Sequence, residues 1–258
     1  MKDMWPSLFL AALSGGLIAK LLDYLAAWVK ASRGEKKSAK ELVDAHLDPL
    51  LKAADAIVGK TTSLAERDFS LLTFQNKSTS ADAFNSDLIG LAYLYARFWG
   101  RIEILAEESL GMSLTSDKRG AKLQQFIACL GSQRIRLVNR TNQNAIGEIT
   151  TELSPAGGRR TIGVVEFGRK VSEDSSASAW CKPLLQLLAD AHVKAIRQRL
   201  LVYGVVVHAL VDTLDPDHQS THPRSSYTNK LSKNSKREIE LLAFGEYLKK
   251  VGAVNQYT

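Results

Sequence analysis

The stretch LLVYGVVVHALV, residues 200–211, is apolar on every side of a helix except at His208. A membrane-spanning helix needs about 20 apolar residues, so this run is too short to cross a bilayer and is typical of a central buried helix. The surrounding pattern predicts one continuous helix from Trp180 to Leu214, with Pro183 near its start. Asp215-Pro216 predicts where that helix stops. The rest of the protein is expected to pack around it.

Four further segments repeat apolar residues at helical spacing, which predicts helices. The clearest lies between Leu88 and Ala106 and is predicted to end near Gly111. Pro49 after Asp48 is typical of the first turn of a new helix with Asp48 as its N-cap, so we expect a kink or break there. The other segments are residues 42–58, 118–130 and 235–252, with Leu241, Phe244, Leu248 and Val251 facing inward in the last.

Short β-type patterns lie in the middle of the chain. Residues 134–138 alternate between basic and apolar side chains, and residues 161–167 are rich in β-branched side chains. Together with a turn at residues 155–158, they predict either a small two-stranded hairpin or an irregular insert. Polar loops are expected at residues 77–83 and 218–234. The sequence therefore predicts a mainly α protein, a helical bundle with a small β hairpin.

The N-terminus is strongly apolar, because residues 4–29 carry only Lys20 and Asp23 as charged side chains. A helix over this range is long enough to cross a hydrocarbon core of about 30 Å. The two charges lie close enough on a helix to pair, which reduces the cost of insertion. We therefore expect a retained single transmembrane helix that anchors the protein. The anchor residues are Trp5, Leu13, Gly15, Gly16, Leu17 and Trp28, and indole rings favour the membrane interfaces.

Other interpretations of this N-terminus stay open. A signal peptide needs a basic start and a small-residue cleavage site, whereas Lys2 is offset by Asp3 and the apolar run continues to Trp28. An amphipathic helix lying in the membrane interface fits the same residues. So does a buried N-terminal helix of a soluble oligomer.

A basic juxtamembrane segment, residues 30–41, follows the apolar stretch directly. Its basic residues as far as Lys40 are opposed only by Glu35. By the positive-inside rule, they predict that the helical domain at residues 42–252 is cytoplasmic. The segment would also attract anionic lipid headgroups, although a solvated helix face explains the same residues. These basic residues are Lys30, Arg33, Lys36, Lys37 and Lys40.

The chain has 258 residues and a formal charge of +7. Its length and composition indicate one folded domain after the anchor. A basic domain beside a membrane has two natural acidic partners, lipid headgroups and nucleic acid. Cys129 and Cys181 are the only cysteines and lie in apolar surroundings. No disulfide framework or cysteine-based zinc site is therefore expected.

The densest set of potential metal ligands is Asp212, Asp215, Asp217, His218 and His222. The two histidines would share one face of a helix, but Pro216 and Pro223 oppose a continuous helix there. A helix C-terminus followed by a capped turn explains the same residues and is the favoured interpretation. His208 is expected to be an uncharged, hydrogen-bonded core histidine. We therefore expect no catalytic residues, no metal and no cofactor.

Arginines in the middle of the chain support an alternative function. If they gather on one face, they would form a phosphate-binding surface for nucleic acid. Aromatic residues interleaved for stacking on single strands are missing, and a solvated surface explains the same pattern. The residues concerned are Arg134, Arg136, Arg140, Arg159 and Arg160.

Several short blocks carry a resemblance: LDPLLKAAD (47–55), YLYARFWGRIE (93–103), NAIGEI (144–149), Trp180 with Pro183-Leu184, and LVDTLDP (210–216). Together they resemble an uncharacterised family of bacterial membrane-anchored helical proteins, over most of the chain. The resemblance implies a bacterial inner-membrane protein with an N-terminal helix and a cytosolic domain, and no established activity. Small anchored proteins of this kind are often parts of bacterial systems, including antiviral defence against phage.

The expected function is that of a membrane-anchored helical interaction or effector protein without enzymatic activity. It would bind membrane lipids and either a protein partner or a second copy of itself. Small residues around Gly15 and Gly16 would let two anchor helices pack closely. The alternative is an effector that binds or cleaves nucleic acid through its basic surface.

Overall fold

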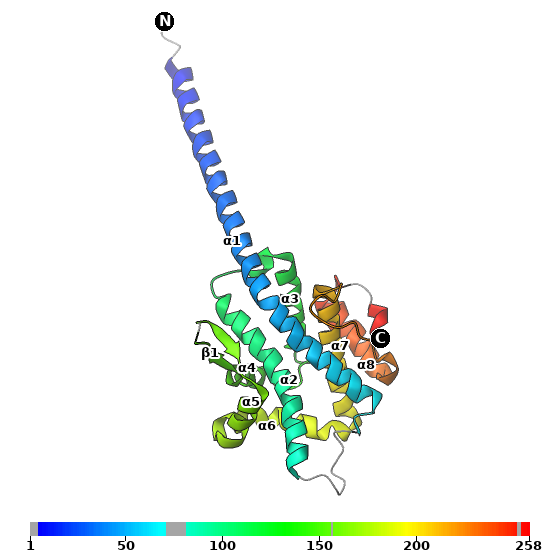
Figure 1. The fold of residues 1–258 in the computed structure, drawn as a ribbon. Helices are drawn as coiled ribbons and strands as arrows, with labels where there is room; N and C mark the ends of the chain where they lie inside the picture. Colours follow the sequence, from blue (N-terminus) through cyan, green and yellow to red (C-terminus); the bar gives the residue numbers. More distant parts are fainter. Residues whose placement is uncertain (1–4, 71–80, 156, 252–253) are drawn as a thin grey trace.

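The computed structural model describes residues 5–70, 81–155, 157–251 and 254–258, without the side chains of residues 5–23, 25–32 and 81–85. The described chain is mainly helical and contains a small antiparallel hairpin (Figure 1). The α-helices are α1 (Trp5–Glu66), α2 (Ala81–Glu108), α3 (Lys118–Leu130), α4 (Arg140–Ile149), α5 (Val164–Glu173), α6 (Ser175–Ala189), α7 (Lys194–Leu214) and α8 (Lys233–Glu238). The strands are β1 (Thr151–Leu153) and β2 (Arg159–Thr161), and the short helices are η2 (Leu114–Ser116), η3 (Asp190–His192), η4 (Thr228–Lys230), η5 (Ile239–Tyr247) and η6 (Val254–Gln256).

Helix α7 forms the centre of the body. Every residue from Leu200 to Val211 is buried, and α1 and α3 pack against this helix. The indole nitrogen of Trp99 on α2 donates a hydrogen bond to the hydroxyl of Tyr203, 2.9 Å away. Gly204 allows α1 to approach closely, because a Cβ atom there would lie 2.8 Å from Thr61. The predicted central buried helix is confirmed.

Two further helices match their predicted positions. Helix α3 runs from Lys118 to Leu130, and the carboxylate of Asp117 caps it by accepting hydrogen bonds from two backbone amides of its first turn. Helix α2 covers the apolar stripe between Leu88 and Ala106. The loop expected at residues 77–83 lies mostly outside the described residues, and its last three positions belong to α2.

Helix α1 continues past Pro49 without a break, so the expected new helix is wrong. The carboxylate of Asp48 does not cap a helix start but accepts a hydrogen bond from Lys52 at 2.8 Å. Leu47 and Leu50, on either side of the proline, are both buried. Their packing outweighs the one backbone hydrogen bond that proline removes. Figure 1 shows the first half of α1 projecting from the body and the second half lying against it.

The single helix expected from Trp180 to Leu214 is also wrong, because η3 separates α6 from α7. The backbone of Val193 is extended, with φ −76° and ψ 126°, and this residue precedes the first turn of α7. The interruption lets α6 pack on α2, α4 and α5 while α7 packs on α1 and α3. The tight turn is stabilised by Ala191, which is fully buried.

The hairpin forms around the predicted turn but with different strands. Strands β1 and β2 are antiparallel, with Thr151 opposite Thr161. Gly157 and Gly158 in the turn have φ values of 86° and 74°, a left-handed conformation that favours glycine. Residues 134–138 form turns and bends, and the β-branched residues after Ile162 begin helix α5. Those two strand predictions are wrong.

The C-terminal helical segment is mostly a π-helix, η5. Its last turn has the corresponding spacing, because the amide of Leu248 donates to the carbonyl of Ala243 five residues earlier, at 2.9 Å. Phe244 and Leu248 are buried as expected. Leu241 is instead 57% exposed, so its predicted inward orientation is wrong. The wider π-helical turn changes which side chains share a face.

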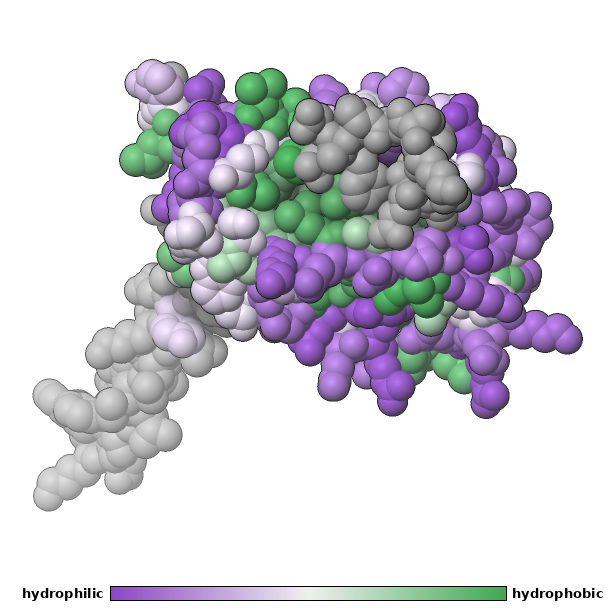
Figure 2. All heavy atoms as spheres, turned by 90° about the horizontal axis from the view of Figure 1, so that it is seen from below, coloured by the Kyte–Doolittle hydropathy of each residue, from purple (hydrophilic) through white to green (hydrophobic). Residues whose placement is uncertain are grey.

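The face of the body opposite the projecting helix is mostly hydrophilic. Seen from the end opposite the projecting helix, hydrophilic side chains surround smaller hydrophobic areas (Figure 2). The large apolar side chains that are exposed on the body belong to several different elements. They are Leu110, Leu153, Val164, Val165, Trp180, Val193 and Leu241.

Candidate functional site

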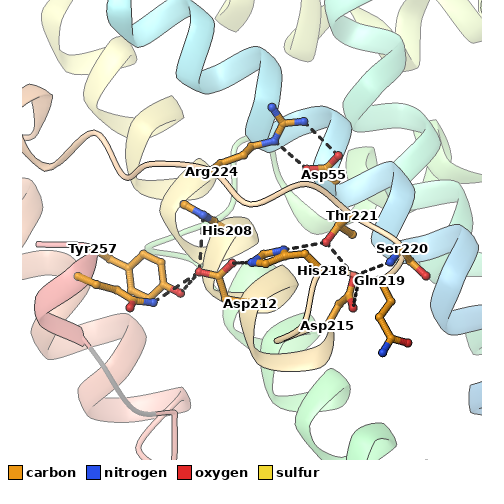
Figure 3. Close-up of polar contacts among 11 residues, drawn as sticks. Asp55, His208, Asp212, Asp215, His218, Gln219, Ser220, Thr221, Arg224 and Tyr257 are labelled. Atoms are coloured by element: carbon orange, nitrogen blue, oxygen red, sulfur yellow. Dashed lines mark hydrogen bonds and ion pairs between the residues drawn. The ribbon is translucent and has the colours of Figure 1, made fainter.

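A polar network joins the loop after α7 to α1, to α7 itself and to the C-terminal residues (Figure 3). Much of it is buried, and it contains most of the residues that the sequence suggested as metal ligands. Its charged and titratable members are Asp55, His208, Asp212, Asp215, His218, His222, Arg224 and Tyr257.

The carboxylate of Asp215 organises the turn that follows α7. It accepts hydrogen bonds from the backbone amides of Gln219 and Ser220, at 2.9 and 3.0 Å, and from the hydroxyl of Thr221 at 2.8 Å. Burial alone would raise the pKa of Asp215, but these hydrogen bonds outweigh it and hold the pKa below its usual value. The predicted helix C-terminus followed by a capped turn is confirmed.

The Thr221 hydroxyl links Asp215 to His218. Because the Thr221 hydroxyl donates its proton to Asp215, its oxygen is left to accept one from Nδ1 of His218, 3.1 Å away. The other ring nitrogen of His218 then faces Asp212, with Nε2 3.7 Å from Oδ1 (Figure 3). His218 adopts a left-handed backbone conformation, with φ 49°, that aims its ring in this way.

Asp212 is the centre of the network. Its Oδ2 atom accepts a hydrogen bond from the Tyr257 hydroxyl and lies 3.6 Å from Nε2 of His208. One carboxylate therefore faces two imidazole rings, neither within hydrogen-bond distance. The ring of His208 also packs edge-on against Tyr257, with 5.4 Å between the ring centroids.

His208 is buried, as expected for a core histidine, but Nε2 of its ring has no hydrogen-bond partner among the described residues. The predicted core position of His208 is confirmed, and the hydrogen bond expected for its ring is not formed at Nε2. Burial lowers the pKa of His208, and the carboxylate of Asp212 opposes this effect without overcoming it. Since the ordinary pKa is about 6.5, the ring is uncharged at neutral pH.

Asp55 on α1 binds two residues of the loop after α7. Its oxygens accept hydrogen bonds from Nε and Nη2 of Arg224, at 2.7 and 3.1 Å, and Oδ2 lies 2.8 Å from Nδ1 of His222. The Asp55 side chain is 10% exposed, whereas that of His222 is 77% exposed. Burial would raise the pKa of Asp55, but the hydrogen bonds from Arg224 and His222 lower it. Asp55 and Arg224 were not among the residues that the sequence singled out.

The arrangement is suited to fastening the loop and the C-terminal residues onto α1 and α7. The buried carboxylates of Asp55 and Asp215 and the partly exposed carboxylate of Asp212 are each already bound by side chains or amides of the same chain. Within the described parts of the protein, no group of three or more His, Cys, Asp or Glu side chains is placed to hold a metal ion. Asp217 lies outside the network and is exposed.

The predicted anchor falls outside the residues whose side chains are described. This applies to Trp5, Leu13, Gly15, Gly16, Leu17, Trp28 and Lys30. Where the structure does describe the chain, it contains no helix that combines the length and the apolar character needed to cross a bilayer. The basic residues Arg33, Lys36, Lys37 and Lys40 are all exposed on α1 just before it enters the body.

The five arginines of the nucleic-acid alternative lie on different parts of the body. Arg159 and Arg160 on β2 are ion-paired with Glu107 and Glu152, each at 2.8 Å. Arg140 begins α4 and lines a cavity described below. Arg134 and Arg136 lie in the turns between α3 and α4.

No protein-family profile matches the chain, and no curated protein or solved structure is significantly similar to it. The resemblance to bacterial membrane-anchored helical proteins therefore stays a prediction.

Proposed function

We propose that this protein is a helical interaction module held at the bacterial inner membrane by its projecting N-terminal helix, with the body on the cytoplasmic side. The observation that carries the proposal is the arrangement of α1. Its first half projects from the body (Figure 1), and its apolar sequence ends in a basic segment where the helix meets the body.

The length of the projecting segment supports this function. Ala39 is the first residue of α1 that the structure describes as buried. At about 1.5 Å per residue, the helix from Trp5 to that point is about 50 Å long. This exceeds the hydrocarbon core of about 30 Å, so the basic segment can lie at the headgroups while the body stays in water.

The charges of the basic segment are available to lipids. Of its described basic residues, only Lys37 forms an ion pair, with Glu41 at 3.8 Å, and both side chains are largely exposed. Such a pair contributes little in water. Each basic residue beside an anionic membrane surface is worth about 1 kcal/mol of attraction.

Fractionation of bacterial cells tests the membrane association directly. The full-length protein is expected in the membrane pellet after both high-salt and carbonate washes. Leu17→Lys places a charge in the apolar run and should shift the protein to the supernatant, since a charge there costs about 2–3 kcal/mol. The matched control is Leu110→Lys, because Leu110 is 82% exposed on the body. Release of the unmodified protein by carbonate would contradict the anchor.

Self-association through the anchor is the interaction we propose first. Gly15 and Gly16 are small enough to let two membrane helices approach closely. Gly15→Leu is expected to weaken chemical cross-linking between copies in detergent. Gly34→Leu is the control, because Gly34 is exposed and a Cβ atom there meets no other atom within 4 Å. Equal cross-linking in both variants would count against self-association and in favour of a different protein partner.

The nucleic-acid alternative has one supporting observation. Arg134, Arg136 and Arg140 lie close in sequence, and none is ion-paired with a described carboxylate. If they bind phosphates, affinity for nucleic acid falls steeply as salt rises. Reversing the charges of all three arginines should abolish binding of nucleic acid. If the unmodified protein does not bind nucleic acid even at low salt, this alternative is wrong.

A further inference from the structure

A cavity of about 560 Å³ opens between α2, α3, α4, α7 and the end of η5. This volume is within the usual range for small-molecule sites, about 300–1,000 Å³. We propose that the cavity binds an uncharged ligand of nucleoside size whose planar heterocycle has a hydrogen-bonding edge. The site is independent of the membrane association proposed above.

Two polar side chains in the cavity wall lack a partner within the described chain. Gln143 on α4 is only 7% exposed, and its side-chain amide forms no hydrogen bond with the other described residues. The hydroxyl oxygen of Ser132, just after α3, is buried and also unpaired. Buried polar groups are hydrogen-bonded in the great majority of cases. A ligand with adjacent donors and acceptors would pair with the side-chain amide of Gln143.

Glu103 on α2 adds a carboxyl group to the same wall. It is half-buried and forms no hydrogen bond or ion pair with the other described residues. Burial raises its pKa, Glu148 and Glu107 raise it further, and only Arg140 acts in the opposite direction. The charged side chains that line the cavity are Glu103 and Arg140, so the wall offers no net positive charge to an anionic ligand.

Three aromatic residues contribute to the cavity wall. Trp99, Tyr203 and Tyr247 all line the cavity. Trp99 and Tyr203 are 3% and 0% exposed and are hydrogen-bonded to each other, whereas Tyr247 is partly exposed. Tyr247 is the last residue of η5, and π-helical turns are frequent at functional sites. A planar heterocycle can stack on the Tyr247 ring while its polar edge meets the side-chain amide of Gln143 and the carboxyl group of Glu103.

Binding of adenosine, guanosine, cytidine and uridine to the full-length protein tests the proposal. Isothermal titration calorimetry in detergent should show saturable binding of at least one of them below about 1 mM. The matching 5′-monophosphate should bind no more tightly, because the charges of Glu103 and Arg140 balance and leave no net positive charge for the phosphate. Absence of binding for all four nucleosides would overturn the proposal. Tighter binding of the monophosphate would overturn the uncharged class of ligand.

Substitutions of polar residues in the cavity wall test whether the nucleoside binds there. Gln143→Leu and Glu103→Leu should each weaken nucleoside binding about tenfold or more, because each removes a hydrogen-bonding group from the ligand's edge. Gln133→Leu is the matched control, since Gln133 is exposed and does not line the cavity. Glu103→Gln keeps a polar group and should retain part of the affinity. Equal affinity in all four variants would place the ligand elsewhere and overturn the proposal.

Discussion

Asp55 joins two segments that are 167 positions apart in the chain. Its side chain is buried, and its main partner, Arg224, is 28% exposed. Asp55→Ala would leave that guanidinium partly buried without its counter-charge. We expect the free energy of unfolding to fall by about 2–4 kcal/mol. Chemical denaturation monitored by circular dichroism measures this change.

Asp48 on the same helix provides the control for that variant. Its ion pair with Lys52 is about half exposed at both side chains, and exposed pairs of this spacing contribute about 0.3–0.5 kcal/mol. Asp48→Ala should therefore have little effect. Similar losses from the two aspartates would mean that the contact between Asp55 and the loop does not stabilise the fold.

His208 makes stability depend on pH. Burial lowers its pKa in the folded protein, while Asp212 opposes this effect, His218 and Arg224 add to it, and Asp55 also opposes it. The unfolded chain takes up a proton near pH 6.5, and the folded protein takes it up only at lower pH. This contribution to stability is therefore complete above about pH 6.5 and is lost as the pH falls through the folded-state pKa.

His208→Gln tests this dependence. Between about pH 7.5 and pH 5.5, His208 should account for a loss of at most about 1.4 kcal/mol in the free energy of unfolding. The variant should lose less stability than the unmodified protein over that interval. His192→Gln is the control, because His192 is exposed and contacts only a backbone carbonyl. An unchanged pH dependence in His208→Gln would contradict the conclusion that protonation of His208 makes the stability depend on pH.

At the scale of elements, α2 and α4 can pack closely because Gly147 on α4 has no side chain. A Cβ atom at Gly147 would lie 2.7 Å from Cγ of Glu103 and 3.1 Å from the backbone of Trp99. Gly147→Ala should force the helices apart and lower the free energy of unfolding by about 1–3 kcal/mol. Thermal and chemical denaturation measure this loss.

Gly90 on α2 gives the opposite expectation. A Cβ atom there meets no atom within 4 Å, so Gly90→Ala should stabilise the helix by about 0.5–1 kcal/mol through its better helix propensity. If Gly147→Ala is as stable as Gly90→Ala, the conclusion that α2 and α4 pack too closely for a side chain at position 147 is wrong.

The sequence predicted the elements whose apolar spacing is unambiguous and missed those decided by distant contacts. The stripes of α2 and α3 and the buried run of α7 follow from local periodicity. Pro49 has the local signals of a helix start, but burial of Leu47 and Leu50 keeps α1 continuous. The break between α6 and α7 has no Gly or Pro to mark it, because it is set by the different neighbours of the two helices.

The candidate site was predicted only where its contacts are local. Asp215, His218 and Thr221 lie within one turn, so the capped turn could be inferred from the residues present. Asp55 had one signal, since it lies on the apolar face of α1, four residues after Leu51 and three before Val58. That signal indicates a buried carboxylate but not its partner, because Arg224 is 169 positions away.

At the scale of the whole molecule, we expect the projecting part of α1 and the body to have separate functions. The described core begins at Ala39, so we expect the body to be equally stable without the residues before the basic segment. Removing residues 1–32 should leave the melting temperature unchanged within about 2 °C, since no described core contact is lost. The same truncation should release the protein from membranes, because the apolar run is gone.

The truncated protein also separates the two proposals. If the cavity between α2, α3, α4 and α7 is formed by the body alone, nucleoside affinity in the truncated protein equals that of the full chain. A melting temperature lowered by much more than the predicted 2 °C would mean that the N-terminal half of α1 packs against the body or a second copy in solution. In that case the buried-oligomer interpretation of the N-terminus would replace the membrane anchor.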